Sequence, residues 1–141
     1  MRTSLMSRKS LLYETKGKGS TFRLIPTRPP KEEVSTWERG IFHGKKIIVL
    51  STMTMTRRGP LDYLRGLGMI SSGDGSAAYF TVTGVARGTK NFGENVTGQI
   101  LYSRKCTGHL GPLSNVKASF QTIVDSKGFR TQVWKKQDQP E

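Results

Sequence analysis

The chain has 141 residues, of which 23 are Lys or Arg and 10 are Asp or Glu, so its formal net charge is +13. This length favours one domain, and the single cysteine excludes an intramolecular disulfide. No apolar run approaches the ~20 residues of a membrane helix, and the basic first residues lack the apolar segment of a secretory signal. These features predict a cytoplasmic protein that attracts polyanions and has no membrane span.

Alternation of apolar and polar residues with a period of two dominates the chain and predicts strands along nearly all of it. The expected strands lie at 11–16, 21–25, 33–37, 45–56, 61–71, 77–86, 96–103, 115–124 and 129–136. The sharpest turn signal is Asp74-Gly75, because this pair adopts the positive φ angles of a tight hairpin. The segment 125–128 gives a second hairpin turn.

Many short strands at regular spacing predict an all-β fold. Glycines inside the strand patterns, such as Gly66, Gly68, Gly84 and Gly98, permit the bends and close approaches that a closed barrel requires. We therefore expect a single antiparallel up-and-down β-barrel of eight or nine strands. The barrel domain is expected at 11–136, between a basic N-terminal tail at 1–10 and a C-terminal tail at 137–141.

Short turn and glycine motifs follow one another in a fixed order along most of the chain. They are Leu11-Leu12-Tyr13-Glu14, Lys16-Gly17-Lys18, Gly66-Leu67-Gly68-Met69-Ile70, Asp74-Gly75, Thr83-Gly84, Arg87-Gly88, Thr107-Gly108, Leu110, Leu113, Asn115, Asp125, Gly128 and Val133-Trp134. This order resembles small uncharacterised microbial barrel proteins of the calycin-like type, and more distantly lipocalin-like and allene-oxide-cyclase-like barrels. The resemblance implies a barrel fold but no catalytic residue.

Our first functional hypothesis is a non-catalytic module that binds a small, partly apolar ligand inside the barrel. An eight-stranded barrel is just wide enough to be filled by side chains or to hold one small ligand, so both interiors remain open. The candidate cavity residues are an alternating Met ladder and one face of the next strand: Met53, Met55, Tyr63, Arg65, Leu67 and Met69. Arg65 is the candidate polar anchor.

The alternative hypothesis is a basic barrel that binds RNA or single-stranded DNA. Such barrels combine a positively charged groove with aromatic side chains on which bases stack. The candidate phosphate contacts are three basic pairs at expected strand ends: Lys45 and Lys46, Arg57 and Arg58, and Arg104 and Lys105. Because these pairs are dispersed, we favour the small-ligand hypothesis slightly.

Residues for catalysis or metal binding are few. Cys106 and His109 have Cys-x-x-His spacing, but a zinc site needs three or four ligands and the chain has one Cys and two His. Glu32 and Glu33 point to opposite faces of an extended strand, so they cannot act together on one substrate. We therefore expect no metal, no cofactor and no catalytic residue, and enzymatic activity is the third alternative.

Overall fold

A computed structural model describes residues 11–136 of the chain. The expected tails at 1–10 and 137–141 lie outside these described residues. The strands are β1 (Leu11–Gly17), β2 (Ser20–Ile25), β3 (Lys31–Phe42), β4 (Lys45–Arg58), β5 (Leu61–Ser72), β6 (Ala77–Gly88), β7 (Glu94–Tyr102), β8 (Lys117–Asp125) and β9 (Gly128–Lys135), and the short 3-10 helices are η1 (Lys90–Phe92) and η2 (Gly108–Leu113). The described helices are all too short and too polar to cross a membrane.

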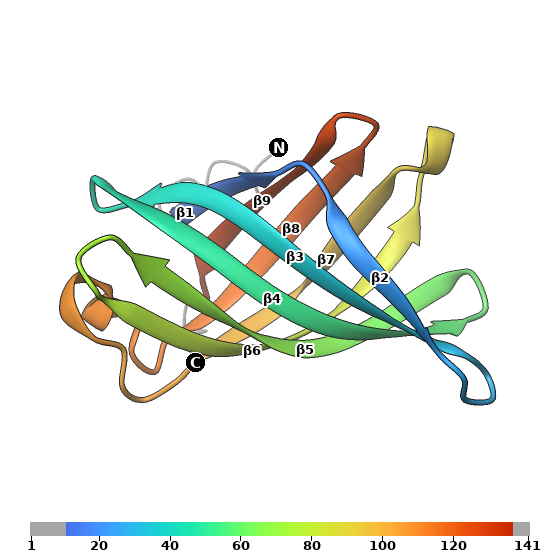
Figure 1. Cartoon of the computed structure of the whole chain (residues 1–141), viewed down its shortest axis with the longest axis horizontal. Helices are drawn as coiled ribbons and strands as arrows, with labels where there is room; N and C mark the ends of the chain where they lie inside the picture. The colour runs from blue at the N-terminus through green and yellow to red at the C-terminus, as the bar shows by residue number, and fades with distance from the viewer. Residues whose placement is uncertain (1–10, 137–141) are drawn as a thin grey trace, which may run out of the picture.

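Eight strands close into an antiparallel barrel, and β2 is added to its wall (Figure 1). Consecutive strands from β3 to β9 pair with one another, and β9 pairs with β1. The barrel closes where β1 pairs with the second half of β3, with Glu14 opposite Ile41 and Lys16 opposite Arg39. The first half of β3 pairs instead with β2. The predicted up-and-down antiparallel barrel of eight or nine strands is thus confirmed.

The apolar core lies inside the barrel because the strands alternate between inward and outward side chains. On β4, for example, Ile47 and Val49 are buried, whereas Ile48 and Leu50 are exposed. One end of the barrel is covered by η2, whose Leu110 and Leu113 are buried in the same core. The interior is therefore packed with side chains from the strands and from this cap.

One strand is much longer than its sequence predicts. Expected at 33–37, β3 runs from Lys31 to Phe42, through Gly40, a residue type that is disfavoured in strands. The extension has a tertiary cause, because both β1 and β4 pair with this part of β3. The chain then reverses at His43 and Gly44, which both have positive φ angles. Such pairing partners are distant in sequence, so local propensity does not reveal them.

Candidate functional site

The barrel interior contains a cavity of about 60 Å³. A small organic ligand requires a pocket of roughly 300–1,000 Å³, whereas a volume of this size holds only a few water molecules. Large side chains reduce the interior space, and Phe80 and Phe120 both line the cavity. The interior of the described barrel is therefore mostly filled.

Polar groups gather around this cavity, and the central one is Glu38 of β3, which is only 8% exposed. The hydroxyl of Thr15 donates a hydrogen bond of 2.5 Å to Oε1 of Glu38. Burial raises the pKa of the Glu38 carboxyl, although the hydroxyls of Thr15 and Thr131 oppose this shift. No Lys, Arg or His of the described chain lines the cavity. A neutral carboxylic acid fits this environment better than a carboxylate.

Nearby, the hydroxyl groups of Tyr13 and Tyr102 form a buried hydrogen bond with each other. Burial raises the pKa of both phenols. Both tyrosines therefore stay neutral at physiological pH, with one hydroxyl donating a hydrogen bond to the other.

The predicted cavity residues separate into two groups. Met53 and Met55 lie on the inner face of β4, and Met53 lines the small cavity. The other four residues were expected to point into the barrel, and this prediction is wrong. They lie on the outer face of β5: Tyr63, Arg65, Leu67 and Met69. Their neighbours Leu64 and Ile70 are 5% and 0% exposed.

The physical reason for this reversal is the packing of Gly68. A Cβ atom on Gly68 would lie 2.2 Å from the Phe80 ring and 2.6 Å from the carbonyl oxygen of Leu50. Phe80 therefore occupies the interior space that a larger residue on β5 would fill. The face of β5 that carries the smaller residues, including Gly66 and Gly68, therefore points inward. The face that carries the larger residues points outward.

The predicted basic pairs do not form one surface. Lys45 and Lys46 begin β4, whereas Arg57 and Arg58 end it, at the opposite end of the barrel. The pair at 104–105 follows β7 and lies near the start of β6, at the Lys45 end. Two of these cations also have acidic partners, with Lys45 3.3 Å from Asp74 and Arg57 3.0 Å from Asp62.

Cys106 and His109 also point to different partners. The Cys106 thiol lies 3.8 Å from the carbonyl oxygen of Ser103, whereas Nδ1 of His109 lies 3.1 Å from Asp74 and 3.2 Å from Ser76. Among residues 11–136, no three His, Cys, Asp or Glu side chains are grouped as a metal site would require.

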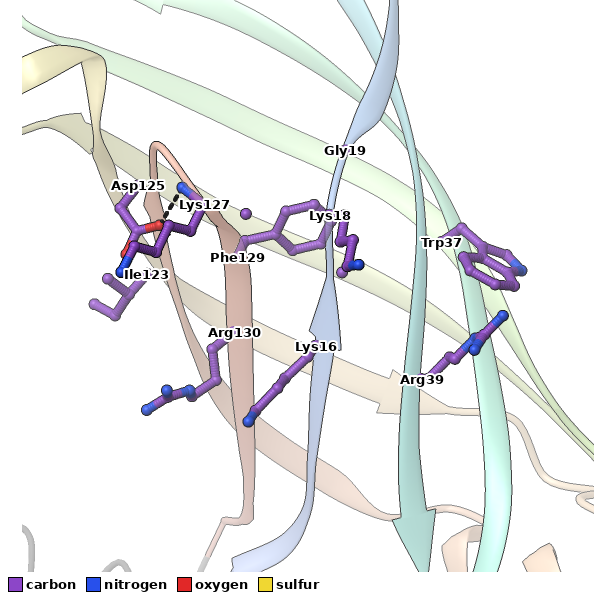
Figure 2. Close-up of a pocket in the computed structure, with 12 residues that line it drawn as sticks. Lys16, Lys18, Gly19, Trp37, Arg39, Ile123, Asp125, Lys127, Phe129 and Arg130 are labelled. Atoms are coloured by element: carbon purple, nitrogen blue, oxygen red, sulfur yellow. Dashed lines mark hydrogen bonds between the residues drawn. The ribbon is translucent and has the colours of Figure 1, made fainter.

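A second hollow lies at the outside of the barrel, where β8, β9, β1 and β3 follow one another (Figure 2). Its volume is about 700 Å³. It is lined by five cations, one carboxylate, three large apolar side chains and three glycines: Lys16, Lys18, Arg39, Lys127, Arg130, Asp125, Trp37, Ile123, Phe129, Gly17, Gly19 and Gly128. We call this hollow the cationic groove.

Strand register places three of these cations side by side. Lys16 of β1 is directly opposite Arg39 of β3 on one side and Arg130 of β9 on the other. All three side chains are exposed, and directly paired residues share one face of a sheet. Like charges in such positions destabilise a sheet. A row of this kind is typical of a functional site, where local stability is given up for binding.

Only part of this repulsion is relieved within the described chain. Nε of Arg130 lies 3.5 Å from Glu14, and the Arg39 guanidinium lies 4.5 Å from the centre of the Trp37 ring. Lys16, Lys18 and Lys127 make no ion pair with any described residue. Three ammonium groups thus remain available to an anion that enters the groove.

The floor of the groove depends on Gly17, the last residue of β1. A Cβ atom there would lie 2.5 Å from the Phe129 ring and 2.8 Å from the Trp37 carbonyl oxygen. The missing side chain lets the Phe129 ring pack over β1, on the opposite face of the sheet from Lys16 and Arg130. Figure 2 shows Lys16 and Arg130 together on one side of the groove and Trp37 with Arg39 on the other.

The sequence alone did not reveal this site, because its cations are separated along the chain by other residue types. Basic pairs were the visible signal, whereas the groove takes its cations from β1, the following turn, β3, the β8–β9 turn and β9. The pairing of β1 with both β3 and β9 brings them together. Comparison of the chain with protein-family models, curated proteins and solved structures gave no match.

Proposed function

We propose that the protein binds single-stranded nucleic acid in the cationic groove. The observation that carries this proposal is the row Arg130, Lys16 and Arg39 beside the indole of Trp37. Phosphate groups neutralise such cations and release counterions from the nucleic acid. The net charge of +13 adds long-range attraction for a polyanion.

The aromatic side chains favour a single strand over a duplex. Trp37 is 44% exposed, and Phe129 lies across the groove from it. Unpaired bases stack on such rings, and each stacked base contributes about 1–3 kcal/mol. A duplex keeps its bases stacked on one another, so it gains only the phosphate contacts.

The small-ligand hypothesis has less support from this geometry. The interior cavity measures about 60 Å³, well below the roughly 300 Å³ at which ligand pockets begin. Of the residues expected to line a ligand cavity, Tyr63, Arg65 and Leu67 are exposed on the outer wall. A ligand within the barrel would have to displace core side chains.

The proposal is tested by titrating a labelled single-stranded oligonucleotide and following its fluorescence anisotropy at several salt concentrations. The logarithm of the affinity should fall linearly with the logarithm of the salt concentration, by about 0.7 for each phosphate neutralised on a single strand. The variant K16Q/R39Q/R130Q removes the row but keeps similar side-chain stems. We expect at least tenfold weaker binding and a slope shallower by about 2.

The matched control is K31Q/R58Q/R65Q, which removes one Lys and two Arg at exposed positions of β3, β4 and β5, at least six residues along the strands from the register of Arg39. Its affinity should stay within a few-fold of the wild type. Equal losses in both variants would show that net charge alone drives binding, and would contradict a specific groove. Lack of binding to both DNA and RNA strands at physiological salt would make the proposal wrong.

The role of Trp37 is tested separately by intrinsic fluorescence. The chain has two tryptophans, so W134F leaves Trp37 as the only tryptophan, whose emission is followed by exciting above the absorption of tyrosine. An oligonucleotide should quench this emission by stacking, whereas polyphosphate, which has no bases, should compete for the groove with little quenching. Equal quenching by both would contradict base stacking.

A further inference from the structure

The outer face of β3 to β7 carries an apolar wall that is distinct from the floor of the cationic groove. It consists of large side chains that are exposed or half-buried: Trp37, Leu50, Leu67, Met69, Tyr79 and Leu101. These strands are consecutive neighbours around the barrel (Figure 1). We call this surface the outer apolar wall.

Strand register makes the wall continuous. Leu50 is directly opposite Trp37 on one side and Met69 on the other, and Met69 is in turn opposite Tyr79. In the adjoining row, Thr81 is directly opposite Leu67 on one side and Leu101 on the other. Directly opposed side chains lie about 4.5–5.5 Å apart at Cβ, so these rows form one surface.

The wall contains no charged side chain, in a chain that has 23 Lys or Arg and 10 Asp or Glu. The remaining positions of the two rows, Ser35 and Thr52, are neutral as well. Charges resume at Arg39 on one side of the rows, at Arg65 on the other, and at Lys117 of β8, which is directly opposite Leu101 at the end of the second row. An acidic partner protein would be drawn to cations, which this wall lacks. Two copies of a chain with a net charge of +13 can instead meet here without opposing their charges.

The size of the wall approaches what a stable dimer requires. Apart from Met69, its named members are 39–63% exposed. On the scale of ~150–250 Å² that a large aromatic side chain buries, the wall presents on the order of 600 Å². Ile48 adjoins Leu50 on β4 and is 38% exposed. Monomers rarely expose more than a few hundred Å² of contiguous apolar surface, and a standard interface covers about 800 Å² per partner.

We propose that the outer apolar wall is the interface of a homodimer in which two barrels pack wall to wall. The same patch would serve both subunits, as in other two-fold symmetric dimers. Two sheets packed in this way lie about 10 Å apart, with their side chains interdigitating. The interface would be centred on Leu67, Met69 and Tyr79, whereas Trp37 lies at the edge of the wall and also lines the cationic groove. The inference depends only on the wall and not on the binding of nucleic acid.

Sedimentation velocity of the full chain tests the proposal. High salt is used because it removes bound nucleic acid and screens the charge repulsion between the two copies. Interfaces of this size bind with micromolar to picomolar affinity, so at ~100 μM the wild type should sediment with twice the mass of one chain. L67K and Y79K each place a charge within the wall and should sediment with the mass of one chain. A monomeric wild type at this concentration would overturn the proposal.

The control is T97K, which adds the same charge to an exposed outer position of β7 that lies in a different row. It should stay dimeric, as should the conservative variant L67M. Circular dichroism and thermal melting establish that each variant is folded, and the use of two strands protects against one variant that misfolds. A dimer that persists in folded L67K and Y79K would show that another surface holds the copies together.

Discussion

Thr15 and Glu38 form the most deeply buried contact between a hydroxyl and a carboxyl group in the described barrel, with Oγ1 and Oε1 2.5 Å apart. Both side chains point into the interior from the two strands that close the barrel. A carboxylate buried there without a cation would lose its hydration with little compensation. The folded state therefore holds Glu38 in its neutral form over a wider pH range than the unfolded chain does.

The first prediction follows from the sign of this shift. The pKa of Glu38 is raised above its usual 4.5 by burial, so the folded state binds a proton more tightly than the unfolded state does. The contribution of Glu38 to stability is then complete below pH 4.5 and is lost as the pH rises through the folded-state pKa. Glu38→Gln should remove this dependence and should be at least as stable as the wild type at pH 7. Urea unfolding as a function of pH measures both.

The control for this prediction is Glu33→Gln, which changes a partly exposed carboxylate that lies 3.1 Å from Arg23. Its free energy of unfolding at pH 7 should change by less than about 0.5 kcal/mol. A Glu38→Gln profile parallel to the wild type would mean that Glu38 does not titrate differently in the two states.

Asp74 should show the opposite dependence on pH. Hydrogen bonds from the Ser76 side chain and backbone, together with smaller contributions such as that of Lys45, hold the pKa of this carboxyl well below its usual 3.8. Its contribution to stability is present above pH 3.8 and is lost as the pH falls towards the folded-state pKa. Asp74→Asn should lower the melting temperature at pH 7. The difference from the wild type should shrink on acidification, and a difference that is constant from neutral to acidic pH would contradict this assignment.

The buried pair Tyr13 and Tyr102 allows a double-mutant test. Removing either hydroxyl leaves the other buried without its partner, which costs about 1–3 kcal/mol. Tyr13→Phe and Tyr102→Phe should each lower the free energy of unfolding by this amount. The double variant should be less destabilised than the sum of the two, because no hydroxyl is then left unpaired. Strict additivity in chemical denaturation would contradict the interaction.

Period-two alternation was sufficient to predict the strands and the barrel, but not which face of β5 points inward. Both faces of that strand are largely apolar, with Tyr63 and Leu67 on one face and Leu64 and Ile70 on the other. Side-chain size alone suggests that the face with the larger residues points inward. In the structure, Phe80 from β6 fills the interior space over Gly68. The neighbouring strand therefore decides which face of β5 is buried.

The cationic groove was unpredictable for a related reason. Lys16, Arg39 and Arg130 are far apart in sequence and become neighbours only through the register of β1 against β3 and β9. A shift of one residue in that register would turn every side chain of the strand to the other face. A single sequence indicates that cations are numerous, whereas their arrangement depends on how the barrel closes.

The last prediction concerns Gly68, the glycine of β5 against which the Phe80 ring packs. The Cβ of Gly68→Ala would lie 2.2 Å from the end of the Phe80 ring and 2.6 Å from the backbone oxygen of Leu50. The Phe80 ring borders the small cavity and can shift in part, whereas the backbone oxygen of Leu50 is fixed by its sheet, so we expect a loss of about 1–3 kcal/mol in the free energy of unfolding. Gly88→Ala is the matched control, because nothing lies within 4 Å of its Cβ position. Its stability should be unchanged or raised by about 0.4–1 kcal/mol, through the reduced freedom of the unfolded chain.

The double variant Gly68→Ala/Phe80→Leu should recover part of the loss, since the smaller side chain makes room for the methyl group. If urea unfolding gave equal stabilities for Gly68→Ala and Gly88→Ala, then Phe80 would not fill the interior over β5, and the outward direction of Tyr63 and Leu67 would need another cause.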